Sequence, residues 1–196
     1  MIIVDMEASG VDPHKHSLVS VGALDFDNPE NQFYEECHVW EGAHIDDEAL
    51  KVNGFSKKEI TDKNKESDKD LAVHFLEWAK SCVEHTIAGQ NPSADRDFLR
   101  ITAERYHINW PLAYRTVDLH SVCFSHMIKR GLAIPVVNKR SDLNLDKIMS
   151  YVGLDFGRGA HNALEDTKIE AETFSRLFYD KILLSEFKKY PIPWIS

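Results

Sequence analysis

The sequence has little positive charge. Lys and Arg number 23 against 32 Asp and Glu among the 196 residues, which gives a formal net charge of -9. A protein that clamps long nucleic acid by releasing counterions normally presents a basic surface. Either nucleic acid is not the ligand, or contact is limited to a few terminal nucleotides and bound cations supply the positive charge that the side chains lack.

Cysteine is also scarce. Cys37, Cys82 and Cys123 lie far apart in the sequence and form no C-x-x-C pair. The sequence therefore suggests neither a disulfide framework nor a zinc site. We interpret the three cysteines as buried thiols of a protein from a reducing compartment.

Long apolar segments are missing as well. No stretch approaches the roughly 18 apolar residues of a membrane-spanning helix. Met1 leads at once into Ile2-Ile3-Val4, without the basic segment and cleavage site of a secretory signal. We therefore expect a soluble, cytoplasmic protein that does not bind a membrane. Its length and 43% apolar content suit one globular domain, which we predict over 1–196, with 191–196 as a C-terminal tail.

The order of the predicted elements indicates an α/β fold. Apolar alternation and turn residues predict five strands, at 1–7, 17–26, 32–40, 86–88 and 115–117. Helical periodicity predicts helices near 46–52, 68–84, 94–107, 118–130, 142–151 and 162–181. A turn at 27–31 joins the second and third strands into a hairpin, and 131–141 is expected to be a long, mobile loop. This order favours a mixed five-stranded sheet flanked by helices.

Two acids stand in the first predicted strand. Asp5 and Glu7 are two residues apart, so their side chains leave one face of the strand while Val4 and Met6 point to the other. Gly10 then helps to end the strand, which places the pair near its carboxyl end, where open α/β sheets usually bind ligands. A D-x-E pair alone is common, and the alternative is two acids that mark a strand leaving the core.

A third acid lies on the apolar face of a predicted helix. Asp95 shares a stripe with Phe98, Leu99 and Thr102, at spacings of three, four and seven residues, so we expect it to face the core. Asp97 falls on the opposite side, where a solvated carboxylate is expected. The alternative for Asp95 is an ordinary first-turn acid that the helix dipole favours.

A fourth acid repeats this pattern in the last predicted helix. Asp166 falls within the broad apolar arc that includes Phe174. Glu170 lies in the same arc, and we expect it at the rim of the site. Glu172 and Arg176 take the opposite side of the helix. His161 would be rotated away from Asp166 on a continuous helix, so we place it on the preceding turn, free to reach over the site.

Four converging carboxylates predict a metal centre. Ionised carboxylates that face a core are costly unless they are paired or bind a cation, and several together repel one another. Oxygen ligands select hard ions, so we expect Mg²⁺ or Mn²⁺ rather than zinc. Two such ions about 3.5 to 4 Å apart can flank a phosphoryl centre, one activating water and the other stabilising the leaving 3′ oxygen. Phosphodiester hydrolysis is the chemistry that most needs this arrangement.

Three motifs carry a family resemblance. They are Val4-Asp5-Met6-Glu7-Ala8-Ser9-Gly10, Gly89-Gln90-Asn91-Pro92-Ser93-Ala94-Asp95 and His161-Asn162-Ala163-Leu164-Glu165-Asp166. In order and spacing they resemble the three acidic motifs of the DEDD exonucleases, which include proofreading exonucleases, ribonuclease T and oligoribonuclease. A histidine five residues before the last aspartate resembles the histidine subclass, and Asn162 stands where the other subclass has tyrosine.

The resemblance implies a ribonuclease H-like fold and a 3′-5′ exonuclease that releases nucleoside 5′-monophosphates. Asp5, Glu7, Asp95 and Asp166 would then be the ligands of two divalent metal ions. His161 would be the general base that takes a proton from the attacking water. The ordinary histidine pKa of about 6.5 suits that role near neutral pH.

The resemblance also implies contacts with substrate. The backbone of Ala8, Ser9 and Gly10 would lie against the terminal nucleotide, and Asn91 would lie near its sugar or phosphate. Phe55 could stack on the terminal base, although a buried phenylalanine is an equal alternative.

The predicted substrate is the 3′ end of single-stranded DNA or RNA. One alternative is an RNA-specific enzyme of the oligoribonuclease type, which would require a 2′-hydroxyl group. Another is a non-catalytic, nuclease-like scaffold that binds a protein. A scaffold has no physical need for four carboxylates that repel one another, which argues against it. Dimers are common among the family's relatives, so a homodimer stays open.

Overall fold

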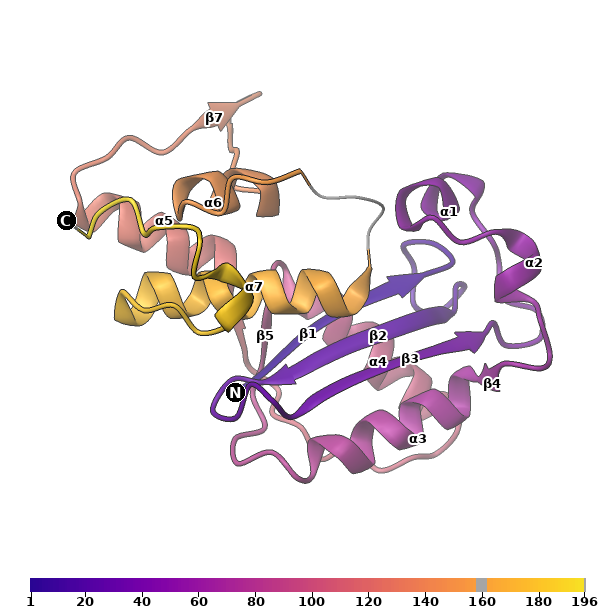
Figure 1. Ribbon diagram of the computed structural model, residues 1–196. Helices are drawn as coiled ribbons and strands as arrows, with labels where there is room; N and C mark the ends of the chain where they lie inside the picture. Colours follow the sequence, from indigo (N-terminus) through magenta and orange to yellow (C-terminus); the bar gives the residue numbers. More distant parts are fainter. Residues whose placement is uncertain (158–161, 196) are drawn as a thin grey trace.

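The fold is a mixed sheet with helices on both faces (Figure 1). The computed structural model describes residues 1–157 and 162–195. The strands of the main sheet are β1 (Ile2–Ala8), β2 (Leu18–Asp25), β3 (Gln32–His38), β4 (Glu66–Ser67), β5 (Ile87–Gly89) and β6 (Thr116–Asp118). Their order is β4-β3-β2-β1-β5-β6. β1 is central, because it pairs antiparallel with β2 and parallel with β5.

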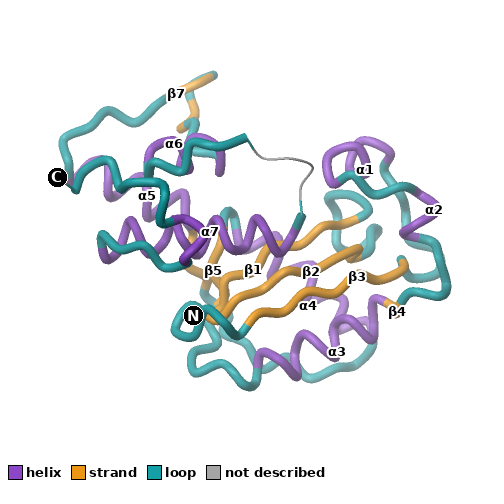
Figure 2. Tube along the Cα trace, viewed as in Figure 1, coloured by secondary structure: helices purple, strands orange, loops and turns teal. Residues whose placement is uncertain are grey.

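Most of the helices divide between the two faces of the sheet, as Figure 2 shows by secondary structure. They are α1 (Asp47–Asn53), α2 (Lys57–Ile60), α3 (Asp68–Ala79), α4 (Pro92–Arg105), α5 (Leu119–Lys129), α6 (Leu145–Tyr151) and α7 (Ala163–Tyr179), with a 3-10 turn η1 at Ser185–Phe187. α3 and α4 cover one face, whereas α5, α6 and α7 lie on the other. Within the described residues, no helix is both long and apolar enough to cross a membrane.

β1 contributes to the core on both of its faces. Ile3 belongs to the apolar cluster that contains Phe174 of α7, whereas Ile2 and Val4 belong to the cluster that contains Leu99 of α4. Side chains alternate between the faces of a strand. The face that carries Ile3 therefore continues toward the carboxyl end of β1 against the α7 layer.

The sheet has six strands, where the sequence predicted five. The additional strand, β4, consists of Glu66 and Ser67 and pairs in parallel with Cys37 and His38 at the edge of the sheet. Two residues are too few to show alternation, so only the contact with β3 reveals this strand. The predicted hairpin of β2 and β3 is confirmed. The expected loop 131–141 holds a small hairpin of its own, β7 (Val136–Val137) and β8 (Arg140–Ser141).

The side of α7 opposite the apolar arc, where the sequence placed Glu172 and Arg176, is buried as well. Both side chains are fully buried, and Arg176 Nε donates to Glu172 Oε1 at 2.7 Å. The guanidinium group also donates to the carbonyl oxygens of Val152 and Tyr190, at 2.9 and 3.0 Å. The second Glu172 oxygen accepts from the backbone N–H of Leu183 at 2.8 Å. The C-terminal segment covers this side of α7, so the pair is buried with its hydrogen bonds satisfied.

The C-terminal tail packs against the helical layer. The ring of Trp194 stacks on Tyr151, with centroids 5.4 Å apart, and its Nε1 donates to Asp180 at 2.5 Å. The guanidinium group of Arg130 lies 4.9 Å from the centre of the same ring. The tail is thus held by Trp194 and by Ile192, which is buried at 6% exposure.

Candidate active site

Asp5 and Glu7 project from β1 on the face that carries Ile3. Asp5 lies opposite Gly22 of β2 and Glu7 lies opposite Ser20, and the register shifts directly after Glu7. The two carboxylates thus stand at the end of the central strand, beside the α7 layer, as their spacing in the sequence predicted.

Gly22 allows α7 to approach β2 closely at this point. A Cβ atom at position 22 would lie 2.3 Å from the carbonyl carbon of Ala163, so a larger residue requires the helix to move. Thr167 Oγ1 donates to the Gly22 carbonyl oxygen at 3.0 Å, and the Asn162 side chain caps the first turn of the helix. Together these contacts place Asp166, in that first turn, over β1.

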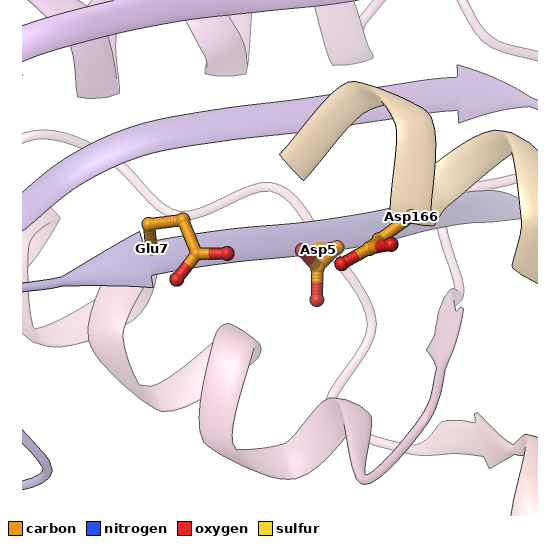
Figure 3. Close-up of side chains that lie close together, drawn as sticks. All are labelled: Asp5, Glu7 and Asp166. Atoms are coloured by element: carbon orange, nitrogen blue, oxygen red, sulfur yellow. The ribbon is translucent and has the colours of Figure 1, made fainter. Parts of the chain in front are cut away.

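Asp5, Glu7 and Asp166 form a compact group of carboxylates. One oxygen from each lies within 4.8 Å of the others. Figure 3 shows Asp5 between Glu7 and Asp166, with two residues on the strand and one on the helix. Glu7 is 9% exposed and Asp166 is 4% exposed. About 160 residues separate Asp166 from Asp5 and Glu7 in the sequence, so Asp166 meets the other two only through the packing of α7 on β1.

Asp95 reaches the same strand from the opposite layer. Its Oδ1 accepts a hydrogen bond from the backbone N–H of Met6 at 3.2 Å. This contact is available because β5 pairs with β1 only at Ile2 and Ile3, which leaves the edge of β1 open beyond them. Asp95 is 6% exposed, in the first turn of α4. The predicted orientation toward the core is therefore confirmed, whereas Asp97 is partly exposed and ion-paired with Arg96.

The electrostatics of the group disfavour ionised carboxylates. Burial is the main cause that raises the pKa of Asp5 well above its ordinary value, and the charges of Glu170, Asp95, Glu7 and Asp166 raise it further. Burial also raises the pKa of Asp95 to about 7. Divalent cations would remove this penalty, because they stabilise the ionised forms.

A pocket of about 320 Å³ opens beside Asp5 and Asp166. Its wall includes Glu170, which the sequence placed at the rim but which is only 1% exposed. Glu170 Oε1 accepts from the backbone N–H of Gln90 at 3.2 Å, and an added Cβ at Gly89 would lie 2.9 Å from Oε2. The i, i+4 spacing from Asp166 was the available signal for this fifth carboxylate. The burial of Glu170 depends on the packing of α7 against β5, which the sequence does not show.

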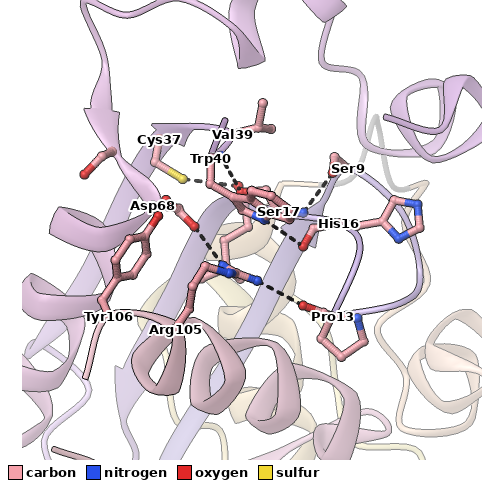
Figure 4. A network of polar contacts seen from close by, with 12 residues as sticks. Ser9, Pro13, His16, Ser17, Cys37, Val39, Trp40, Asp68, Arg105 and Tyr106 are labelled. Atoms are coloured by element: carbon pink, nitrogen blue, oxygen red, sulfur yellow. Dashed lines mark hydrogen bonds and ion pairs between the residues drawn. The ribbon is translucent and has the colours of Figure 1, made fainter. Parts of the chain in front are cut away.

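The segment after β1 is held by a polar network (Figure 4). The hydroxyl group of Ser9 donates to the carbonyl oxygen of His44 at 2.7 Å and accepts from the N–H of Ser17 at 2.9 Å. Ser9 is fully buried. Its backbone N–H donates to the Ser17 carbonyl oxygen, and its own carbonyl oxygen accepts from Asp46. The end of β1 is therefore held in place by hydrogen bonds on both sides.

Arg105 joins this segment to α4. Its guanidinium group donates to Asp68 and to the carbonyl oxygen of Pro13, both at 3.1 Å, and it lies 4.7 Å from the ring centre of Trp40. Since α4 also carries Asp95, this contact links that helix to the chain that follows Glu7 (Figure 4).

The other predicted substrate contacts lie around the end of β1. Ala8 is buried, and its carbonyl oxygen accepts from Asn53 at the end of α1, at 3.1 Å. Gly10 is buried, and a Cβ there would overlap the ring of His16.

Two further predicted contacts stand on the flanking segments. Phe55 is half-buried against the apolar cluster of Val19, Val39, Leu50 and Ile60. Asn91 is exposed at the start of α4, with a left-handed backbone at φ 58°. His161 lies outside the described residues. The roles of all these residues stay predictions.

The donor set fits hard divalent cations. The group consists of carboxylates, which are the ligands that Mg²⁺ and Mn²⁺ prefer. Three of them already lie close enough together to offer one oxygen each. Asp95 is buried and Asp5 is partly buried, and the pKa of each carboxyl group is raised, so the site is electrostatically incomplete without positive charge.

Comparison with known sequences identifies the family. Residues 2–174 match the family described as Exonuclease. The chain belongs to this exonuclease family. The 3′-5′ DNA exonuclease Cap18 of Escherichia coli is 29% identical, over 96% of this chain and 94% of that protein. Ribonuclease T of Haemophilus influenzae (strain PittEE) is 25% identical, over 88% of this chain and 76% of that protein.

Solved exonuclease structures share the fold. The nuclease domain of 3′hExo, a DEDDh family member bound to rAMP, superposes with a TM-score of 0.68 at 17% identity, over 93% of both chains. Escherichia coli Exonuclease I in complex with a dA16 oligonucleotide has a TM-score of 0.72 at 15% identity, over 91% of this chain and 41% of that one. The ribonuclease H-like fold and the resemblance to DEDD exonucleases are therefore confirmed. Exonucleases of this type depend on divalent metal and act on nucleic acid.

Proposed function

We propose that this exonuclease removes nucleotides one at a time from the 3′ end of single-stranded nucleic acid and releases nucleoside 5′-monophosphates. The observation that carries the proposal is the convergence of Asp5, Glu7 and Asp166 within 4.8 Å. Asp95 completes the set from the other layer. We assign these four acids to two divalent ions, Mg²⁺ or Mn²⁺.

Different residues of the chain have different roles in the proposed reaction. When bound, the ions would supply a Lewis acid at the scissile phosphate and charge stabilisation for the leaving 3′ oxygen. The N–H of Met6 orients the Asp95 carboxylate. His161 takes the proton from the attacking water, a role that rests on its place in the third motif. The backbone of Ala8 to Gly10, together with Phe55 and Asn91, positions the terminal nucleotide.

The proposal also covers the domain extent, the location in the cell and the sugar of the substrate. We propose a single domain over 1–196 and a cytoplasmic location, which rests on the three free cysteines, all buried. The names of the relatives include a DNA exonuclease and ribonucleases, so both sugars belong in the test.

The test is digestion of matched 5′-labelled DNA and RNA oligonucleotides with Mn²⁺, Mg²⁺ or EDTA, read as a ladder over time. The proposal predicts metal-dependent shortening from the 3′ end, with nucleoside 5′-monophosphates as products. The faster substrate identifies the sugar preference, and an absolute need for the 2′-hydroxyl group would indicate the oligoribonuclease type. A double-stranded version of each oligonucleotide tests the preference for single strands.

A variant shows whether cleavage comes from this protein or from a contaminating nuclease. A metal-binding measurement tests the alternative of a non-catalytic scaffold. Asp5→Asn should abolish the ladder. Mg²⁺ or Mn²⁺ at millimolar concentration should raise the melting temperature of the wild-type protein, because the ions bind the folded state. A folded wild-type protein with neither cleavage nor a melting shift would contradict the proposal and favour the scaffold.

A further inference from the structure

The small hairpin of β7 and β8 lies at the outer edge of the helical layer (Figure 1). Asn138 and Lys139 form its turn, with left-handed φ angles of 51° and 63°. Val136 and Val137 on β7 are 62% and 54% exposed. Two valines exposed side by side, next to a tight turn, do not contribute to the core and leave an apolar strip in solvent.

The base of this hairpin is attached firmly. The backbone N–H of Asp142 donates to the Pro135 carbonyl oxygen at 2.8 Å. The hydroxyl group of Ser141 and Nε2 of His120 on α5 lie 2.7 Å apart, within hydrogen-bond distance. The hairpin is thus a defined projection from α5.

The stretch of sequence that contains the hairpin is basic in a protein that is otherwise strongly acidic. Residues 129–147 contain five basic side chains, Lys129, Arg130, Lys139, Arg140 and Lys147, and two acidic ones, Asp142 and Asp146. This stretch has a net charge of +3, whereas the rest of the chain has -12. Lys139 and Arg140, at the tip, are exposed, and among the described residues neither forms an ion pair with an acid.

The hairpin is continuous with one wall of the acid pocket. Asn144, Leu145 and Asp146 line that pocket. Gln90 Nε2 donates to the Leu143 carbonyl oxygen at 3.0 Å, which ties this wall to the loop after β5. Four residues of chain can carry Arg140 at most about 14 Å from Asn144.

We propose that the hairpin at 135–142 binds the phosphate backbone of the substrate strand, a few nucleotides before its 3′ end. The inference rests on the proposed function, which puts the 3′ end in the acid pocket. Lys139 and Arg140 contact phosphates, and Val136 and Val137 lie against sugars or bases. A nucleic acid strand suits this surface because it combines regular negative charge with apolar faces and must leave the pocket. This contact would let a chain of net negative charge bind a negatively charged nucleic acid strand.

The test compares two variants with the same change in charge. Lys139→Ala/Arg140→Ala removes the two positive charges at the tip of the hairpin. Lys69→Ala/Lys80→Ala removes two exposed lysines, one in α3 and one directly after it, on the opposite face of the sheet. Binding of labelled 12-nucleotide single-stranded DNA and RNA is measured in EDTA, by fluorescence anisotropy, over a range of salt concentrations. EDTA prevents metal-dependent cleavage, so binding is read apart from activity.

The expected effect is specific to the hairpin. Each phosphate contact on a single strand contributes about 0.7 to the slope of log affinity against log salt, so loss of two contacts lowers the slope by about 1.4. If the two contacts contribute nothing at 1 M salt, affinity at 0.1 M falls about 25-fold. The α3 variant should bind like the wild type. In cleavage assays the hairpin variant should raise KM for the 12-nucleotide strand, keep kcat, and leave a dinucleotide substrate unaffected.

Failure of this inference differs from failure of the proposed function. An unchanged slope in the hairpin variant, or an equal loss in the α3 variant, overturns the hairpin assignment while wild-type cleavage still stands. A wild-type protein that neither binds nor cleaves either oligonucleotide overturns both. Equal melting temperatures of the variants and the wild type confirm that the comparison concerns folded proteins.

Discussion

Replacement of Gly22 by alanine tests whether the close contact between β2 and α7 positions the acid site. The new Cβ would lie 2.3 Å from the carbonyl carbon of Ala163. Ordinary contact begins near 3.4 Å, so the helix start must move by about 1 Å, and Asp166 with it. Overpacking of this kind costs about 1 to 3 kcal/mol of the free energy of unfolding. A displacement of about 1 Å at a catalytic group lowers turnover about 100-fold.

The measurement is urea unfolding followed by intrinsic fluorescence, together with the rate of nucleotide release at saturating substrate. Gly157→Ala is the matched control, because no described atom lies within 4 Å of a Cβ at that position, and we expect it to change stability by less than about 0.5 kcal/mol. If Gly22→Ala kept full activity and lost less than that, the contact with Ala163 would not be what places Asp166.

Three further predictions concern buried charges. Asp95→Asn should abolish cleavage in a folded protein, whereas Asp97→Asn, at a partly exposed residue paired with Arg96, should change the rate little; equal losses would refute the assigned register of α4. The pKa of Asp95 is raised by burial to about 7, so the folded state holds an extra proton and, without metal, stability falls as pH rises through about 7. Melting in EDTA should therefore occur at a lower temperature at pH 8 than at pH 5, with a smaller difference in Asp95→Asn, and the reverse order would contradict the assignment. Arg176→Met strands the buried charge of Glu172 and should cost about 3 to 5 kcal/mol in urea unfolding; a loss below about 1 kcal/mol would mean that water reaches the pair.

Local patterns predicted which way the four acids point. Alternation in a strand placed Asp5 and Glu7 on one face, and helical periodicity turned Asp95 and Asp166 inward. Both periods are properties of the backbone, so they can be read without knowing what the element packs against. The same reasoning did not reveal that Glu172 is buried, because periodicity gives no sign that a later segment of the chain will cover a charged face of a helix.

The sequence by itself determined which residues bear charge, which faces of their elements they occupy and which family the three motifs resemble. Tertiary structure alone decided which of these acids meet. Gly22 lets α7 come close enough to set Asp166 beside Asp5, the short pairing of β5 leaves Met6 to bind Asp95, and Glu170 becomes part of the pocket wall. The physical reason is that periodicity is local, whereas distances between elements depend on how residues far apart in the chain pack together.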